Sequence, residues 1–142
     1  VIPPFAFGDP ERTVSNDHLR EPRGRVMNSL RVLRADAVRL HEDGDDAEGF
    51  RRLGAAARIS LAFARQPDEY HQSMGLGSGA TVLYESSAIL RDGTRGSPAP
   101  DDVAAILSLA EHLEASVTIE APKLHEAIGV IRDRLTIAPG PG

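Results

Sequence analysis

The sequence predicts an all-α fold, a bundle of about five helices preceded by an extended, Pro-rich N-terminal arm. Apolar residues recur at helical spacing in four long stretches, and Pro or acidic residues stand where helices would begin. The chain has 142 residues and no Cys, so it is long enough to bury a core without disulfides. We expect an arm over residues 1–20, a single helical domain over 21–137 and a frayed tail over 138–142.

The N-terminal arm combines helix-breaking residues with apolar ones. Residues 1–17 contain three Pro and one Gly, so we expect no regular helix there. Leaving the side chains of Ile2, Phe5 and Phe7 in water would forgo about 1.5–3 kcal/mol of burial for each. We therefore interpret these three residues as an interaction arm, which docks on its own bundle or on a neighbouring subunit.

Two helices are expected in the first half of the domain. The first runs from Pro22 to about His41, because apolar residues recur there at steps of four and three. These residues are Val26, Leu30, Leu33, Ala37 and Leu40. Asp45 and Glu48 form a predicted capping box that starts the second helix, over about 47–65. That helix is apolar over most of its circumference, which is typical of the middle of a bundle or of a subunit interface.

The middle of the chain is predicted to be interrupted. A short helix is expected from Pro67 to about Met74, followed by a Gly-rich connector near 75–80 that we interpret as a hinge. Residues 81–91 are expected to be helical, with a short strand as the alternative because several of them are good strand formers. A loop should follow near 92–99.

The last two helices have the clearest signals. Pro100 opens a helix with apolar residues at helical spacing, and the β-branched run 117–119 together with Pro122 should end it. Pro122 also suits the first turn of the final helix. The apolar seam of that helix is Leu124, Ile128, Ile131 and Leu135.

The net charge of −5 argues against a generally basic nucleic-acid binder. The charge is divided unevenly, because residues 1–65 have a net charge of +1 and residues 66–142 a net charge of −6. We interpret this asymmetry as complementary halves that pack within one chain or between copies. No stretch approaches the roughly 18 continuous apolar residues of a membrane span, so no membrane contact and a cytoplasmic location are expected.

Arginines gather on the expected first and second helices. If these helices lie side by side, their guanidinium groups could form a face for anions or nucleic acid. The residues concerned are Arg20, Arg23, Arg31, Arg34, Arg51, Arg58 and Arg65. The reading we favour is that they pair with the acidic residues of the C-terminal half.

We predict no catalytic residues, no metal site and no cofactor. The five His lack the His-Glu-x-x-His spacing of a zinc site, and the Gly near 75–80 lack the strand and the Lys of a phosphate-binding loop. Arg65 and His71 are similar in spacing to the Arg-x(4–6)-His motif of HEPN-type ribonucleases. That similarity implies an acid–base role for His71, but Pro67 should break the helix that such a motif requires.

The function that fits best is a non-enzymatic interaction or assembly subunit, which forms a homo-oligomer or joins a larger protein complex. The alternative is a nucleic-acid-associated regulatory protein that uses the Arg-rich face. A small helical ribonuclease-like enzyme is a second alternative.

Overall fold

The computed structural model describes residues 9–116 and 121–135, with side chains from residue 24 onward. These residues contain five helices and no strand, which confirms the all-α fold. The helices are α1 (Asp9–Glu42), α2 (Asp46–Ala64), α3 (Glu69–Asp92), α4 (Pro100–Ser116) and α5 (Pro122–Arg134). The chain divides into two compact units, residues 1–32 and residues 33–142. None of the described helices is long and apolar enough to cross a membrane.

The start of α1 corrects the prediction of an extended arm. The helix begins at Asp9, and not at Pro22, so the expectation that residues 9–20 are extended is wrong. Pro10 falls in the first turn, where the missing N–H breaks no helical hydrogen bond. The residues between Pro10 and Pro22 include neither Pro nor Gly, so nothing local interrupts the helix there. The proposed anchor residues of the arm, Ile2, Phe5 and Phe7, lie outside the described residues, as does the tail over 138–142.

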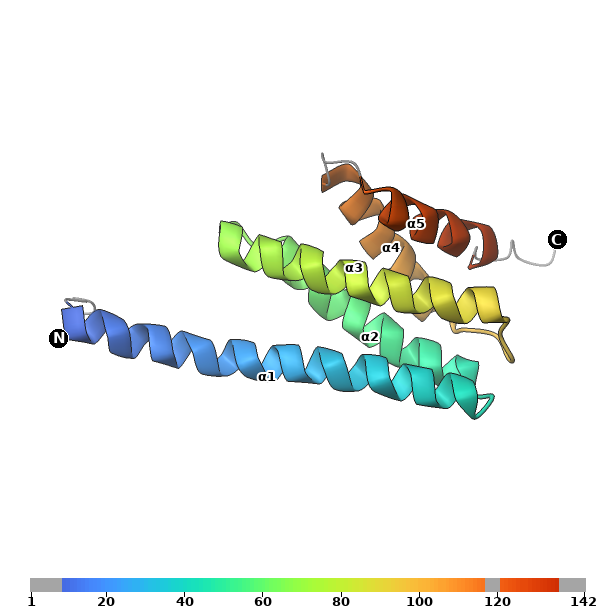
Figure 1. Cartoon of the computed structure of the whole chain (residues 1–142), viewed down its shortest axis with the longest axis horizontal. Helices are drawn as coiled ribbons and strands as arrows, with labels where there is room; N and C mark the ends of the chain where they lie inside the picture. The colour runs from blue at the N-terminus through green and yellow to red at the C-terminus, as the bar shows by residue number, and fades with distance from the viewer. Residues whose placement is uncertain (1–8, 117–120, 136–142) are drawn as a thin grey trace. The chain divides into compact units, whose positions relative to one another are not determined.

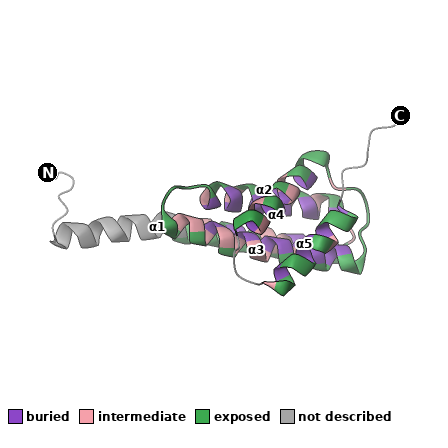
Figure 2. Ribbon diagram, turned by 90° about the horizontal axis from the view of Figure 1, so that it is seen from above, coloured by how far each residue is buried: buried purple, intermediate pink, exposed green. Residues whose placement is uncertain are grey.

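The core of the unit 33–142 lies among helices α2 to α5. Helix α2 packs against α3 and α4, and α3 also packs against α5 (Figure 1). Each of these helices has both buried and exposed residues (Figure 2). The largest fully buried apolar side chains are Phe50, Leu53, Leu83, Ile106, Leu109, Leu113, Ile128 and Ile131. The wide apolar surface of α2 is therefore buried in the middle of the bundle, one of the two positions that the sequence predicts.

The Gly-rich segment is not a connector. Helix α3 is continuous from Glu69 to Asp92, so the expected short helix and hinge near 75–80 are wrong. Gly75 is buried against α2, where an added Cβ would lie 2.6 Å from the carbonyl oxygen of Ser60. Gly79 is buried against α4, where an added Cβ would lie 2.9 Å from Leu109 Cδ1. These two Gly allow close approach of neighbouring helices, a packing role that local flexibility signals do not reveal.

The other predicted boundaries agree with the structure. Residues 81–91 are helical and not a strand, and residues 93–99 form the loop before α4. Helix α4 ends at Ser116, before the β-branched run. Pro122 occupies the first turn of α5, and the predicted seam of that helix is buried at all four positions.

Candidate functional site: an arginine-lined groove

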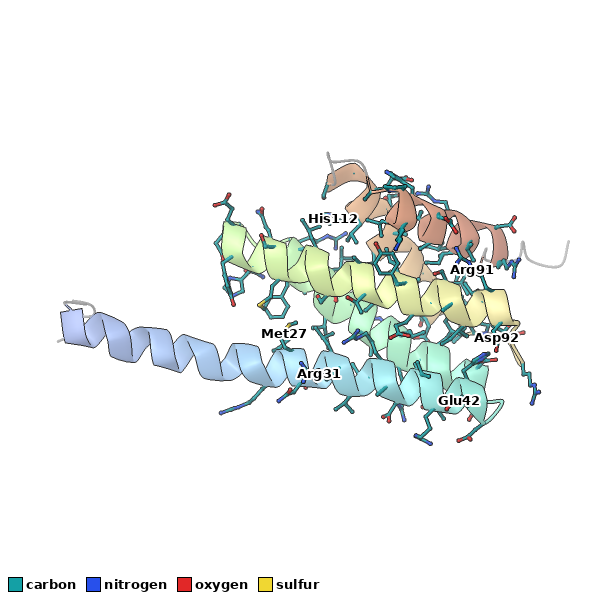
Figure 3. The ribbon with its side chains drawn as sticks, in the orientation of Figure 1. Met27, Arg31, Glu42, Arg91, Asp92 and His112 are labelled. Atoms are coloured by element: carbon teal, nitrogen blue, oxygen red, sulfur yellow. The ribbon has the colours of Figure 1, made fainter. Side chains whose placement is uncertain are left out.

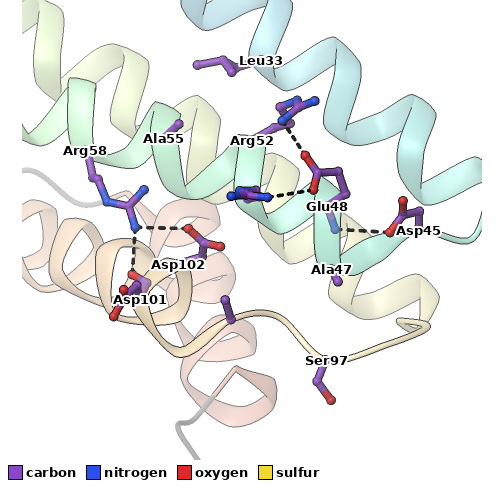
Figure 4. A pocket seen from close by; sticks show the side chains of 12 residues that line it. Leu33, Asp45, Ala47, Glu48, Arg52, Ala55, Arg58, Ser97, Asp101 and Asp102 are labelled. Atoms are coloured by element: carbon purple, nitrogen blue, oxygen red, sulfur yellow. Dashed lines mark hydrogen bonds and ion pairs between the residues drawn. The ribbon is translucent and has the colours of Figure 1, made fainter.

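An open groove of about 800 Å³ lies along α2, facing the loop 93–99 and the start of α4 (Figure 4). Its wall combines charged residues with small apolar ones. The lining residues are Leu33, Asp45, Ala47, Glu48, Arg51, Arg52, Ala55, Arg58, Ser97, Ala99, Asp101 and Asp102. All of them belong to the unit 33–142, so the groove is built within one compact part of the chain.

The helical start of α2 positions the acidic side of the groove. Asp45 caps the helix, because its Oδ1 accepts a hydrogen bond of 3.3 Å from the backbone N–H of Glu48. Only this half of the predicted capping box is formed. The carboxylate of Glu48 instead accepts hydrogen bonds from Arg52 Nη1 at 2.6 Å and from Arg51 Nη1 at 3.4 Å. One carboxylate therefore holds two guanidinium groups at the rim.

Arg58 and Asp102 connect α2 to α4 across the groove. Arg58 Nη2 donates to Asp102 Oδ1 at 3.1 Å and to the backbone carbonyl of Asp101 at 3.2 Å. Asp102 is buried, and it lies against Gly54, where an added Cβ would be 2.6 Å from Asp102 Oδ1. Gly54 thus provides the space in which the carboxylate meets its guanidinium partner.

Arg51 is the most available cation of the groove. Its side chain is 71% exposed, and the 3.4 Å contact with Glu48 uses only one of its five N–H groups. Arg52 is more enclosed, because it contacts Asp36 Oδ2 at 3.9 Å in addition to Glu48. Arg51 is therefore the most exposed of the three guanidinium groups in the groove.

Five of the seven residues of the predicted Arg face have side chains that the structure describes. Arg51 and Arg58 line the groove together with Arg52, which the sequence analysis did not single out. Arg65 is exposed at the C-terminal cap of α2 and is not a lining residue. Arg31 donates to Asn28 on its own helix at 3.3 Å, and Arg34 is half-buried on α1. The side chains of Arg20 and Arg23 lie outside the described residues.

Pairing between the two halves of the chain is limited among the described residues. Arg58 pairs with the C-terminal half as expected, but several ion pairs form within a half. Arg132 binds Glu114 through two hydrogen bonds of 2.8 and 2.9 Å, which hold the pKa of Glu114 below its usual value. Arg91 binds Glu126 at 2.9 Å and links α3 to α5 (Figure 3). Among the described side chains, ion pairs therefore form both within and between the two halves.

The Arg65–His71 pair does not have the geometry that its spacing suggested. Arg65 ends α2, whereas His71 lies in the first turn of α3, after the break at Pro67. His71 Nδ1 contacts Asp68 Oδ2 at 2.6 Å, and the imidazole ring stacks on Phe63 with a centroid distance of 5.6 Å. Asp68 also caps α3 by accepting from the N–H of His71, which lowers the pKa of Asp68. His71 is held by local helix-capping contacts.

A second polar cluster joins the C-terminal ends of α1 and α3 to the N-terminal end of α2. His41 Nδ1 contacts Asp46 Oδ1 at 2.6 Å, and His41 Nε2 contacts Asp92 Oδ2 at 2.7 Å. Asp46 Oδ2 accepts a further hydrogen bond of 2.6 Å from the backbone N–H of Arg95. No spacing rule indicates this cluster, because Asp92 is far from His41 in sequence. Among the described residues, no group of three or more His, Asp or Glu side chains could hold a metal ion.

No protein-family model, no curated protein and no solved structure matches this chain.

Proposed function

We propose that this protein is a non-enzymatic interaction subunit, which binds further copies of itself or another protein subunit through the groove along α2. The observation that carries the proposal is the mixed charge of the groove. Arg51, Arg52 and Arg58 share it with four carboxylates, those of Asp45, Glu48, Asp101 and Asp102. A partner that fits this surface must present both acidic and basic groups, as a folded polypeptide does.

The same charge pattern disfavours the nucleic-acid alternative. Nucleic acid presents a uniform row of phosphates, and binding is strengthened by each cation that neutralises one of them. In this groove the carboxylates outnumber the guanidinium groups, and Arg52 and Arg58 are already engaged by Glu48 and Asp102. A phosphate backbone would displace these pairs and meet repulsion from the freed carboxylates.

Exposed aromatic side chains give secondary support. Tyr70 and Tyr84 are both exposed on α3. Tyr and Arg are enriched at protein interfaces, because each combines a large contact area with hydrogen-bonding groups. Tyr84 and Arg91 line a smaller cavity of about 550 Å³ together with Lys123 of α5. The described surface thus offers anchor residues of the kind that protein partners use.

The test is the mass of the full chain in solution, measured by light scattering over a wide concentration range. We expect a concentration-dependent mass above that of one chain, and we expect Arg51→Glu to reduce it. Arg65→Glu makes the same charge change on the same helix outside the groove, so it should leave the mass unchanged. A single-chain mass at every concentration would contradict self-association.

The nucleic-acid alternative is measured in parallel with a fluorescent DNA duplex. We expect no binding at physiological salt. Binding that weakens equally in Arg51→Glu and Arg65→Glu would overturn the proposal in favour of a distributed cationic face, because phosphate contacts add up without regard to the groove.

A further inference from the structure

The His41 cluster joins three helix ends of the unit 33–142 through one imidazole ring. His41 lies in the last turn of α1, Asp46 lies in the first turn of α2, and Asp92 is the last residue of α3. Figure 3 labels Asp92 at this end of α3. Asp46 also accepts a hydrogen bond from the backbone N–H of Arg95, so the loop 93–99 belongs to the same network. These groups surround a small cavity of about 220 Å³, which Glu42 also lines.

Local backbone geometry brings the three side chains together. Gly44 has φ +82°, which lets the chain reverse between α1 and α2 and returns Asp46 to His41. Gly93 has φ +96° and ends α3 directly after Asp92. A side chain at either position would strain the turn that places a carboxylate beside the ring.

The contacts require a protonated ring. An ionised carboxylate only accepts hydrogen bonds, and both ring nitrogens lie within 2.7 Å of a carboxylate oxygen. Two N–H donors exist only in the imidazolium form. A neutral ring has one N–H, so it can satisfy one carboxylate and must turn a lone pair toward the other.

We propose that His41 is a proton-operated latch, which fastens the end of α3 to the end of α1 while the ring is protonated and releases Asp92 when the ring loses a proton. The direction of release follows from burial. Asp46 is 1% exposed and depends on its donors, whereas the Asp92 side chain is 75% exposed and can be solvated instead. The remaining proton therefore stays on Nδ1, facing Asp46.

The other charged groups around the ring act in both directions. Glu42 of α1 lines the same cavity and favours the imidazolium, whereas Arg95 of the loop 93–99 also lines it and disfavours the cation. The hydrogen bond to Asp92, followed by that to Asp46, outweighs desolvation and raises the pKa of His41 above its usual value of 6.5. The latch therefore opens as the pH rises past that raised value.

Opening the latch would loosen one wall of the groove. Asp92 leads directly into the loop 93–99, and Ser97 and Ala99 of that loop line the groove along α2. The latch itself is independent of the proposed function, because it concerns only contacts within the chain. Whether or not the groove binds a protein, the loop should respond to the protonation of His41.

The experiment is an NMR pH titration of the full chain. The ring signals of His41 are assigned with His41→Gln and followed together with the amide signals of Gly93 and Gly96. We expect His41 to titrate above the ordinary value of about 6.5, and the two loop amides to shift with the same midpoint. Nitrogen chemical shifts of the ring should show the Nδ1–H tautomer above the midpoint.

Two variants separate the latch from a merely structural His. Asp92→Asn should lower the midpoint of His41 and uncouple Gly93 and Gly96 from it. Asp43→Asn removes a nearby exposed carboxylate that pairs with Arg39 and not with His41, so it should leave both readouts unchanged. A midpoint at or below 6.5 in the natural chain, loop amides that do not follow it, or an Nε2–H tautomer would overturn the proposal. These three outcomes are read from the natural chain, so they decide the question even if Asp92→Asn does not fold.

Discussion

At the scale of single residues, we expect the interaction of His41 with its carboxylates to make the stability of the protein depend on pH. The folded state raises the pKa of His41, first through Asp92 and then through Asp46. A group whose pKa is raised on folding contributes stability that is fully present below the unfolded value of about 6.5. That contribution is lost as the pH rises through the folded pKa.

Asp92→Asn should therefore destabilise the protein under mildly acidic conditions and not under alkaline ones. We expect a loss of up to about 1 kcal/mol near pH 5.5, because Asp92 is exposed and such pairs are weak. At about pH 9 the sign should reverse by a few tenths of a kcal/mol, since Asn removes a negative charge from the C-terminus of α3. Chemical denaturation of both proteins at the two pH values measures this difference. An equal effect at both would contradict a role for the protonated ring.

Contacts between individual side chains are the features that the sequence predicts least well. Asp45 was identified as a cap because a cap and its partner are neighbours in sequence. The pairing of His41 with Asp92 joins residues that are far apart in the sequence, so no local pattern encodes it. Arg52 was missed for a related reason. Arg51, Arg58 and Arg65 recur every seven residues, and Arg52 does not follow that spacing. Arg52 nevertheless lines the groove together with Arg51.

At the scale of elements, the periodic helices were predictable and the Gly-rich helix was not. In α4 and α5 the starting Pro and the apolar seam agree, so local preference and packing indicate the same boundaries. In α3 they conflict. Gly disfavours a helix locally, but Gly75 and Gly79 are required where α2 and α4 approach closely. Tertiary packing decides this conflict, and it becomes visible only once the partner helices are placed.

The alternation of packed and open Gly in α3 gives a matched pair of variants. An added Cβ at Gly75 would clash with the backbone N and Cα of Ala64 and with the backbone oxygen of Ser60, which cannot move without separating α3 from α2. We expect Gly75→Ala to cost about 2–3 kcal/mol, in the range of overpacking. An added Cβ at Gly77 meets nothing within 4 Å, so Gly77→Ala should stabilise the protein by about 0.5–1 kcal/mol.

Thermal or denaturant unfolding of the two variants beside the natural chain measures both effects. The hinge interpretation predicts a different outcome. If the segment were a flexible connector, both substitutions would have small effects of the same sign. Opposite changes in the free energy of unfolding at positions only two residues apart require a continuous helix with one face packed against α2.

At the scale of the whole molecule, one reason for expecting assembly no longer holds. The wide apolar surface of α2 suggested a subunit interface, but Leu53, Ala56 and Leu61 are buried inside the unit 33–142. The bundle thus accounts for these residues without a partner. Two other features favour assembly, the mixed-charge groove and the apolar residues near the N-terminus, and each has its own test.

The N-terminal residues provide the last prediction. Ile2, Phe5 and Phe7 are concentrated in the first eight positions, while the unit 33–142 has a buried core of its own. If the three side chains contact a neighbouring subunit, deleting residues 1–8 should lower the mass of the assembly and change the melting temperature little. Burial of these side chains would then contribute about 1.5–3 kcal/mol each to association rather than to folding.

The control keeps the length of the chain and replaces Phe5 and Phe7 by Ser. This double variant should reproduce the loss of mass, because the apolar side chains and not the backbone supply the contact. Light scattering and thermal unfolding on the same samples distinguish docking on a neighbouring subunit from docking on the chain's own bundle. A lower melting temperature with an unchanged mass would mean that these side chains cover the chain's own surface. The groove would then be the remaining support for assembly, since its contacts do not involve the first eight residues.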